Sequence, residues 1–264
     1  MQPIPSKGEL NYIKSGTGEK VMLAFHGFGQ SAEYFQPFEV LSSQYTLYCF
    51  DLPHHGVTNW DESHVVDKSS LKTFFDRFFS SNDISEFSIA AFSLGGKFLL
   101  TLLELYPTKI NSLILIAPDG VKVNVWYKLA TGYSLFHWIF KFIVNNPSPL
   151  FISTDFLRNV GILNKSVLRF IKAHMDTLEK RKQVYLVWNS FKLLKFRERD
   201  IIYLINQNNI QSYLYLGKHD RVIPESKFRR FIRSVENLKL FEFNNGHNHL
   251  VEHVAKRIVM DLKE

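Results

Sequence analysis

Short uninterrupted apolar runs recur along most of the chain, separated by segments with a helical period. The runs at residues 21–25, 46–50, 87–92, 112–117 and 211–216 have the length and composition of strands buried on both faces. Weaker strand patterns lie at 10–14 and 238–243, and helices are expected at 32–42, about 67–81, from residue 94 to Pro107, at 200–206, 225–234 and from about 250. This alternation predicts an α/β protein: a mostly parallel sheet of about eight strands with helices on both faces.

The alternation stops between residues 121 and 200. This segment reads as several helices, interrupted by Pro147 and Pro149. We therefore expect residues 1–120 and 201–264 to form the α/β core, and residues 121–200 to form a helical cap, or lid, inserted at one end of the sheet.

The stretch FSIAAFSLGGKF, residues 87–98, joins a strand pattern to a helix pattern through a tight turn with Ser93 at its tip. A side chain on so sharp a turn needs small neighbours two residues away, and Ala91 and Gly95 meet that need. The pattern is G-x-S-x-G with its first glycine replaced by alanine. On its own it fits an ordinary turn serine as well as a nucleophile.

Polar residues follow several predicted strands directly, and ligands of open parallel sheets bind at that edge. His26 follows the first buried strand, Ser93 the third and Asp119 the fourth, while Asp220 and His247 follow the last two strands. A serine becomes a nucleophile when a histidine takes its proton and a carboxylate orients that histidine. Backbone N–H groups then stabilise the oxyanion, and the N–H groups of Phe28 and Leu94 are the candidates.

Five motifs together resemble the α/β-hydrolase superfamily, in its cap-bearing, esterase-like form. They are His26-Gly27-Phe28-Gly29, Asp51-Leu52-Pro53-His54-His55-Gly56, the Ser93 turn, residues 217–224 (GKHDRVIP) and Gly246-His247. The resemblance implies that Ser93 is the nucleophile, His247 the base and Asp220 its partner, with Phe28 and Leu94 in the oxyanion hole. It also implies no cofactor. His54 departs from the family pattern, which has glycine there.

Several alternatives stay open for these roles. His249 or His253 could replace His247 as the base, and Asp119 could replace Asp220 as the acid. The three histidines at 247, 249 and 253 have no obvious fourth ligand, so no metal site is predicted. His54, His55 and His64 read as loop histidines, and His55 could shape the pocket.

Candidate substrate-binding residues are His26, Trp126, Phe136 and Trp138. His26 reads first as a brace for the oxyanion loop. The aromatic residues belong to the cap, where residues 133–144 (YSLFHWIFKFIV) are strongly apolar. This stretch fits a lid helix that lines an acyl pocket or touches lipid, and it equally fits packing of the cap on the core.

Composition adds limits on partners and location. The chain has 264 residues and a net charge of +7, and residues 121–200 alone hold 14 Lys and Arg against 5 Asp and Glu. Such a segment predicts attraction to anionic substrates or weak contact with an anionic membrane surface, unless its charges are simply solvated. No motif supports nucleic-acid binding. The lone Cys49 forms no intrachain disulfide, and with no signal-like or membrane-spanning run we expect a cytoplasmic protein.

The function expected from these features is hydrolysis of a small apolar or aromatic carboxylic ester through an acyl-enzyme. The alternative is a lyase or C–C bond hydrolase on the same fold with an anionic substrate, similar to the menaquinone-pathway synthase that eliminates pyruvate. A third reading is a binding protein that has lost catalysis. The oligomeric state is not predicted.

Overall fold

The computed structural model describes residues 9–122, 134–148 and 175–261. The chain divides into two compact units. The first contains residues 1–61, 66–122 and 194–264, and the second contains residues 62–65 and 123–193. The assignment of residues 121–200 as a cap stays a prediction.

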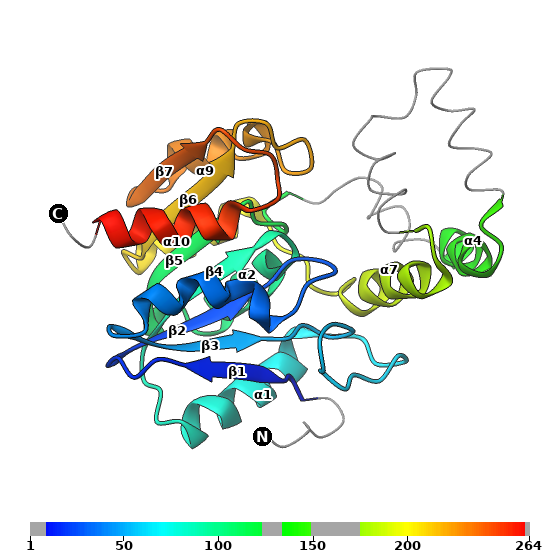
Figure 1. Ribbon diagram of the computed structural model, residues 1–264, viewed down its shortest axis with the longest axis horizontal. Helices are drawn as coiled ribbons and strands as arrows, with labels where there is room; N and C mark the ends of the chain where they lie inside the picture. Colours follow the sequence, from blue (N-terminus) through cyan, green and yellow to red (C-terminus); the bar gives the residue numbers. More distant parts are fainter. Residues whose placement is uncertain (1–8, 123–133, 149–174, 262–264) are drawn as a thin grey trace. The chain divides into compact units, whose positions relative to one another are not determined.

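The core of the first unit is a mostly parallel sheet with seven strands among the described residues, in the order β1-β3-β2-β4-β5-β6-β7 (Figure 1). The strands are β1 (Tyr12–Ser15), β2 (Lys20–Phe25), β3 (Tyr45–Phe50), β4 (Phe87–Phe92), β5 (Ile110–Ile116), β6 (Gln211–Gly217) and β7 (Leu238–Phe243). β1 runs antiparallel to β3, and every other pair is parallel. The α/β class is therefore confirmed, with seven described strands where about eight were expected.

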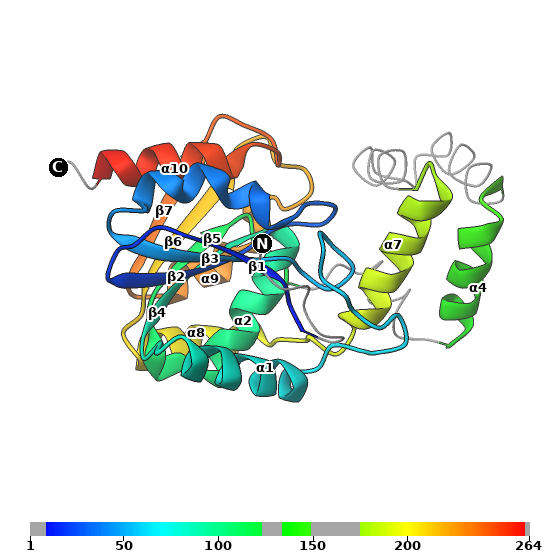
Figure 2. The same cartoon turned by 60° about the horizontal axis from the view of Figure 1, so that its bottom comes forward.

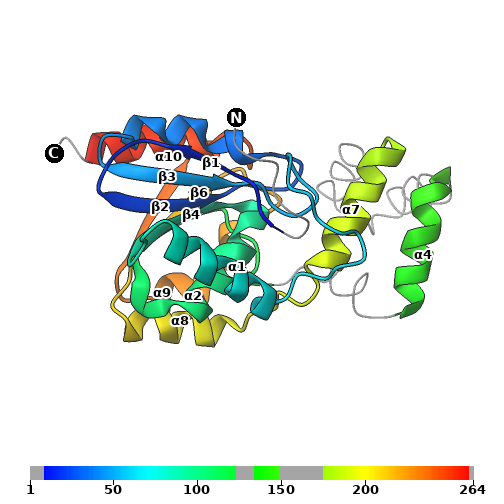
Figure 3. The ribbon, with the colours of Figure 1, turned by 90° about the horizontal axis from the view of Figure 1, so that it is seen from below.

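Helices cover both faces of this sheet (Figures 2 and 3). On one face lie η1 (Ala32–Leu41) and α10 (Leu250–Asp261), and on the other lie α1 (Lys68–Ser81), α2 (Gly96–Leu105), α8 (Glu198–Gln207) and α9 (Arg229–Ser234). Single 3₁₀ turns stand at η2 (Ser93–Gly95), η3 (Pro107–Lys109) and η4 (Glu225–Lys227). Because both faces are covered, the central strands β2 and β4 are buried almost throughout.

The helix expected over residues 32–42 forms as a 3₁₀ helix, η1. Pro37 lies inside it and has no N–H to donate to an α-helical ladder. The segment still buries one apolar side, through Ala32, Phe35, Phe38 and Leu41. The helix was thus expected from the sequence, and the proline changed its type.

Helix α1 begins at a capping box. The Asp67 carboxylate accepts from the Ser70 N–H at 2.8 Å, and the Ser70 hydroxyl lies 3.4 Å from the Asp67 N–H. The buried side of α1 then places Phe75 and Phe78 against Phe50 of β3, with ring centroids 5.5 and 5.2 Å apart. This aromatic layer forms much of the core on the α1 side of the sheet.

The second unit contains helices α4 (Ser134–Asn145) and α7 (Leu178–Ser190). Arg181 of α7 is buried, and its guanidinium donates to the carbonyl of Val144 at 2.9 Å and to that of Met175 at 3.0 Å. Val144 is in the last turn of α4, whose carbonyls have no partner within the helix. The Phe140 ring also contacts Trp188, at 5.4 Å between centroids. One arginine therefore caps α4 and joins it to α7.

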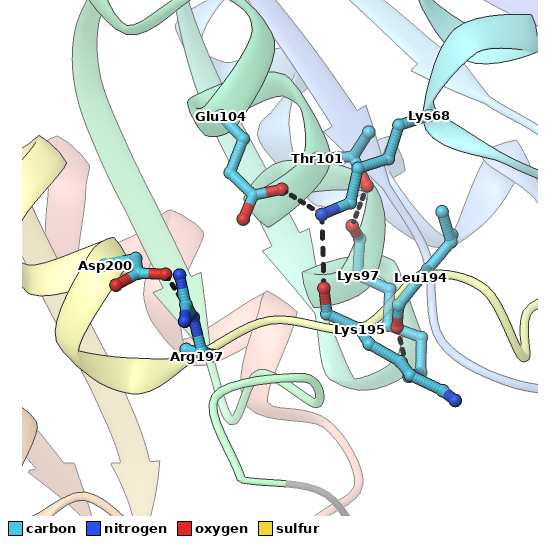
Figure 4. A network of polar contacts seen from close by, with 8 residues as sticks. All are labelled: Lys68, Lys97, Thr101, Glu104, Leu194, Lys195, Arg197 and Asp200. Atoms are coloured by element: carbon cyan, nitrogen blue, oxygen red, sulfur yellow. Dashed lines mark hydrogen bonds and ion pairs between the residues drawn. The ribbon is translucent and has the colours of Figure 1, made fainter.

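The chain re-enters the first unit at Leu194, and two lysines bind this segment (Figure 4). The Lys97 ammonium of α2 donates to the carbonyl of Leu194 at 3.4 Å, and the Lys68 ammonium of α1 donates to that of Lys195 at 3.1 Å. Lys68 also pairs with Glu104. Lys97 is buried, and burial lowers its pKa. These bonds fix the path of the chain just before α8.

Candidate active site

Ser93 lies at the junction of β4 and α2 in a left-handed backbone conformation, with φ of +48°. Such a φ is unfavourable for serine. The close packing of the backbone around Gly95 and Gly96 maintains it here. A Cβ on Gly95 would lie 2.1 Å from the carbonyl oxygen of Phe25, and one on Gly96 would lie 2.4 Å from that of Asp119. Glycine is therefore required at both positions. The tight turn expected from the sequence is present.

Ser93, His247 and Asp220 form one hydrogen-bonded chain, although they come from three different strand ends. The Ser93 hydroxyl lies 2.9 Å from Nε2 of His247. Nδ1 of the same ring lies 2.6 Å from Oδ2 of Asp220. With Nδ1 protonated, Nε2 presents its lone pair to the serine, which is the arrangement that proton removal requires.

The Asp220 carboxylate is fixed by backbone donors on its other oxygen. Oδ1 accepts from the N–H groups of Val222 and Ile223, each at 2.8 Å, and the side chain is fully buried. Gly217, at the end of β6, lets the loop that carries His247 approach closely, because a Cβ there would lie 2.6 Å from the carbonyl of Asn245. Backbone geometry therefore sets the contact between Asp220 and His247.

The rival residues make other contacts. His249 is exposed and lies 3.6 Å from Glu252, while Nε2 of His253 lies 2.8 Å from the Asn245 side chain. Asp119 accepts from the N–H of its neighbour Gly120 at 2.8 Å, in a local turn. The geometry thus favours His247 and Asp220 over the alternatives left open by the sequence.

The proposed oxyanion donors lie on two segments beside Ser93. Leu94 occupies the first turn of the helix that follows Ser93, where backbone N–H groups have no acceptor within the helix. Phe28 is half-buried in the loop after β2, next to Gly29 with φ of +73°. Their action on an oxyanion stays a prediction.

Three further residues support this edge and were not singled out in the sequence. The Phe92 ring packs against the His247 imidazole at 4.9 Å, and Tyr34 stacks on Phe92 at 5.3 Å. Gln30 accepts from the Gly27 N–H at 2.9 Å, and Tyr34 bonds to the Gln30 side chain and the backbone of His249. Phe92 and Tyr34 look like ordinary core residues in the apolar pattern, whereas the amide of Gln30 in a glycine-rich loop was a usable signal.

His26 is wholly buried, and both ring nitrogens contact backbone. Nδ1 lies 2.7 Å from the Gly27 carbonyl, and Nε2 accepts from the Leu52 N–H at 3.1 Å. Burial, with a smaller effect of His55, lowers the pKa of His26 to about 3, so the ring is neutral. These contacts fit the brace reading, and they leave neither nitrogen for a substrate.

The loop after β3 keeps its shape despite the unusual histidine. His54 adopts φ of +64°, the conformation that glycine would supply. Asp51 secures the loop, since its carboxylate accepts from the N–H groups of Ala32 and Val57 at 2.7 and 3.1 Å. His55 is buried against His26, burial lowers its pKa to about 4, and its Nε2 has no hydrogen-bond partner among the described residues.

The structure says less about the predicted substrate-binding residues of the cap. Trp126 lies outside the described residues, as do the side chains of Phe136 and Trp138, although both positions fall within α4.

Within residues 9–122, 134–148 and 175–261, no three His, Cys, Asp or Glu side chains are grouped to hold a metal ion. In the same residues, no helix is long and apolar enough to span a membrane.

Comparison with known proteins defines the family. A family model described as alpha/beta hydrolase fold matches residues 20–159, just over half of the chain. The chain therefore belongs to the α/β-hydrolase fold family, as its motifs indicated.

Several solved structures share this fold, and one curated relative is similar in sequence. A thermophilic esterase from Thermogutta terrifontis is 17% identical with a TM-score of 0.67, covering 96% of this chain and 93% of that one. Naproxen esterase from Bacillus subtilis is 16% identical with a TM-score of 0.60, covering 96% and 91%. The dihydrolipoyllysine-residue acetyltransferase component of the acetoin cleaving system of Cupriavidus necator is 26% identical over 112 residues, which are 42% of this chain and 30% of that protein.

Proposed function

We propose that this α/β hydrolase cleaves carboxylic esters with Ser93 as nucleophile, His247 as general base and Asp220 as its carboxylate partner. The observation that carries the proposal is the 2.9 Å contact between the Ser93 hydroxyl and Nε2 of His247, continued to Asp220 at 2.6 Å. The esterase names of the similar solved structures favour ester substrates over other acyl compounds.

In the first half of the reaction, Ser93 Oγ attacks the ester carbonyl carbon while its proton passes to Nε2 of His247. The buried Asp220 carboxylate stabilises the resulting imidazolium through Nδ1–H. The imidazolium then gives that proton to the alcohol oxygen as the C–O bond breaks, which leaves an acyl group on Ser93. In the second half a water molecule repeats the sequence and releases the acid.

Negative charge on the carbonyl oxygen is stabilised by the N–H groups of Leu94 and Phe28 in this proposal. Loss of one such donor in comparable sites costs about 10²–10³ in rate. The Gln30 side chain accepts from the Gly27 N–H, and the His26 ring contacts the Gly27 carbonyl. Both contacts fix the loop that carries Phe28, so its N–H is positioned before substrate binds. The chemistry requires no cofactor.

The substrate proposed is a small ester with an apolar or aromatic acyl group. Residues 121–200 serve as the selecting cap, and Trp126, Phe136 and Trp138 contribute its apolar lining. This part of the proposal comes from the aromatic and apolar composition of the segment, including α4.

The test is Ser93→Ala, assayed with p-nitrophenyl acetate and butyrate. We expect loss of at least about 10³-fold in kcat/KM, and loss of labelling by a fluorophosphonate probe. Ser81→Ala, at an exposed serine at the end of α1 and outside the candidate site, is the matched control and keeps wild-type turnover. Undiminished ester turnover by Ser93→Ala would overturn the proposal, as would a wild-type protein that cleaves carboxylated diketones but no ester.

A further inference from the structure

A hollow of about 550 Å³ is lined by residues on one face of the sheet. Figure 3 shows η1 and α10 covering this face. The floor of the hollow includes Tyr45, Ser112 and Tyr213, and its walls include Leu41 at the end of η1 and Arg257 in the second half of α10. We term it the basal cavity, because these floor residues belong to the first halves of their strands. Along β4, the five residues from this level to Ser93 span about 16 Å, so the cavity is separate from the candidate active site.

The floor of the basal cavity is hydroxylic where an apolar surface would be expected. Ser112 of β5 lies beside Ser88 of β4, with their hydroxyls 2.9 Å apart, and the Tyr45 hydroxyl bonds to Ser88. Strands covered on both faces normally present large apolar side chains there. The two serines leave space that their neighbours do not fill, and they supply polar atoms at its base.

Two cations, Lys239 of β7 and Arg257 of α10, stand at the rim. The Lys239 ammonium lies 5.8 Å from the centroid of the Tyr213 ring, and the Arg257 guanidinium lies 5.2 Å from that of Phe241. Among the described residues, no Asp or Glu lines the cavity. The two side chains give the rim positive charge, and each also lies over an aromatic ring.

The walls add aromatic and apolar side chains. The half-buried rings of Tyr213 and Phe241 border the cavity, whereas Tyr215, Met22 and Ile114 are almost fully buried. The volume falls in the range of about 300–1,000 Å³ typical of small-molecule sites. An inorganic anion would leave this apolar area unused.

We propose that the basal cavity binds a small apolar monocarboxylate, with its carboxylate beside Lys239 and Arg257 and its apolar body against the rings of Tyr213 and Phe241. The cations select the charge, the rings select an apolar body, and the floor hydroxyls meet a single polar substituent. The proposal is independent of catalysis by Ser93, since no residue is shared between the two sites.

The test is calorimetric titration of the full chain with 2-naphthoate, and with the neutral 2-naphthalenemethanol. We expect the carboxylate to bind and the alcohol to bind at least about tenfold more weakly. The double variant Lys239→Gln with Arg257→Gln weakens naphthoate binding by about tenfold, while Lys256→Gln, the exposed neighbour on α10, leaves it unchanged. Both lining cations are exposed, so these changes do not disturb the core.

Esterase activity is followed in parallel to separate this site from the active site. The double variant keeps wild-type p-nitrophenyl butyrate turnover if the sites are distinct. Equal naphthoate affinity of the wild type and the double variant would overturn the proposal, as would equal binding of the acid and the alcohol, or no binding of either. Ester turnover could fail entirely while naphthoate binding persists, so the two proposals stand or fall separately.

Discussion

The two edges of the sheet in the first unit use unfavourable backbone conformations differently. Among described non-glycine residues, four with positive φ follow the carboxyl ends of strands: His54, Ser93, Ala117 and His249. The other two, Asp83 and Asn209, lie in turns that lead into β4 and β6. Asp and Asn tolerate the left-handed region, whereas Ser and Ala do not. The two residues whose type does not tolerate a positive φ, Ser93 and Ala117, therefore both lie at the carboxyl edge.

The comparison extends to how polar groups are satisfied. At the carboxyl edge, hydrogen bonds engage both oxygens of Asp220 and both ring nitrogens of His247 and of His26. At the amino edge the hydroxyls of Ser88, Ser112 and Tyr45 bond to one another, and two cations stand over aromatic rings beside a hollow. A preorganised hydrogen-bond chain suits chemistry, and an open cationic hollow suits reversible binding.

The largest effect should come from breaking the hydrogen-bond chain at its far end. Asp220→Asn keeps the shape of the side chain but no longer holds His247 as the Nδ1–H tautomer, so we expect kcat for p-nitrophenyl butyrate to fall by roughly 10³–10⁴-fold. Asp119→Asn is the matched control, because an amide oxygen can still accept from the Gly120 N–H. A similar loss in both variants would contradict the assignment of Asp220.

A smaller effect concerns stability in acid. Burial lowers the pKa of His26 to about 3 and that of His55 to about 4, from 6.5 in an unfolded chain. Unfolding therefore takes up protons below about pH 6.5, and the free energy of unfolding should fall as pH decreases toward 4, by up to about 1.4 kcal/mol per pH unit for each histidine. Above pH 7 this dependence disappears.

Urea unfolding between pH 7 and 4 measures this slope. His55→Gln should reduce the slope by the share of one histidine, whatever its effect on stability at pH 7. His219→Gln, at an exposed histidine, is the control that keeps it. An unchanged slope in His55→Gln would show that His55 does not carry the predicted proton uptake.

The smallest effect tests the strain itself. Ser93→Gly relieves an unfavourable φ and should raise the free energy of unfolding by about 0.5–1 kcal/mol while abolishing ester turnover. Asp83→Gly, at nearly the same φ, should change stability by no more than a few tenths of a kcal/mol. Equal responses at the two positions would remove the contrast between the edges.

The sequence predicted the strands, a mostly parallel sheet and the Ser93 turn, because buried runs and small residues around a sharp turn are local signals. It also indicated Asp220 and His247 through their positions after β6 and β7. It left His249, His253 and Asp119 open as alternatives, since spacing along the chain does not say which side chains point at Ser93. Their hydrogen bonds in the structure distinguish them.

Other features depend on packing between distant segments and had no local signal. The contact of Phe92 with His247 joins residues on β4 and after β7. The basal cavity needs Ser88 and Ser112 to meet in register on neighbouring strands. Pro37 is a local signal, but its effect on the type of helix in η1 was not predicted.

The lysine contacts around the return of the chain bear on how such a protein can diversify. Gly120, just before the chain leaves the first unit, and Leu194, where it comes back, both lie against Lys97 of α2. The two connections to residues 123–193 thus meet at one side chain of α2, the helix that follows Ser93. A segment connected in this way can be lengthened, shortened or exchanged with little demand on the parent sheet.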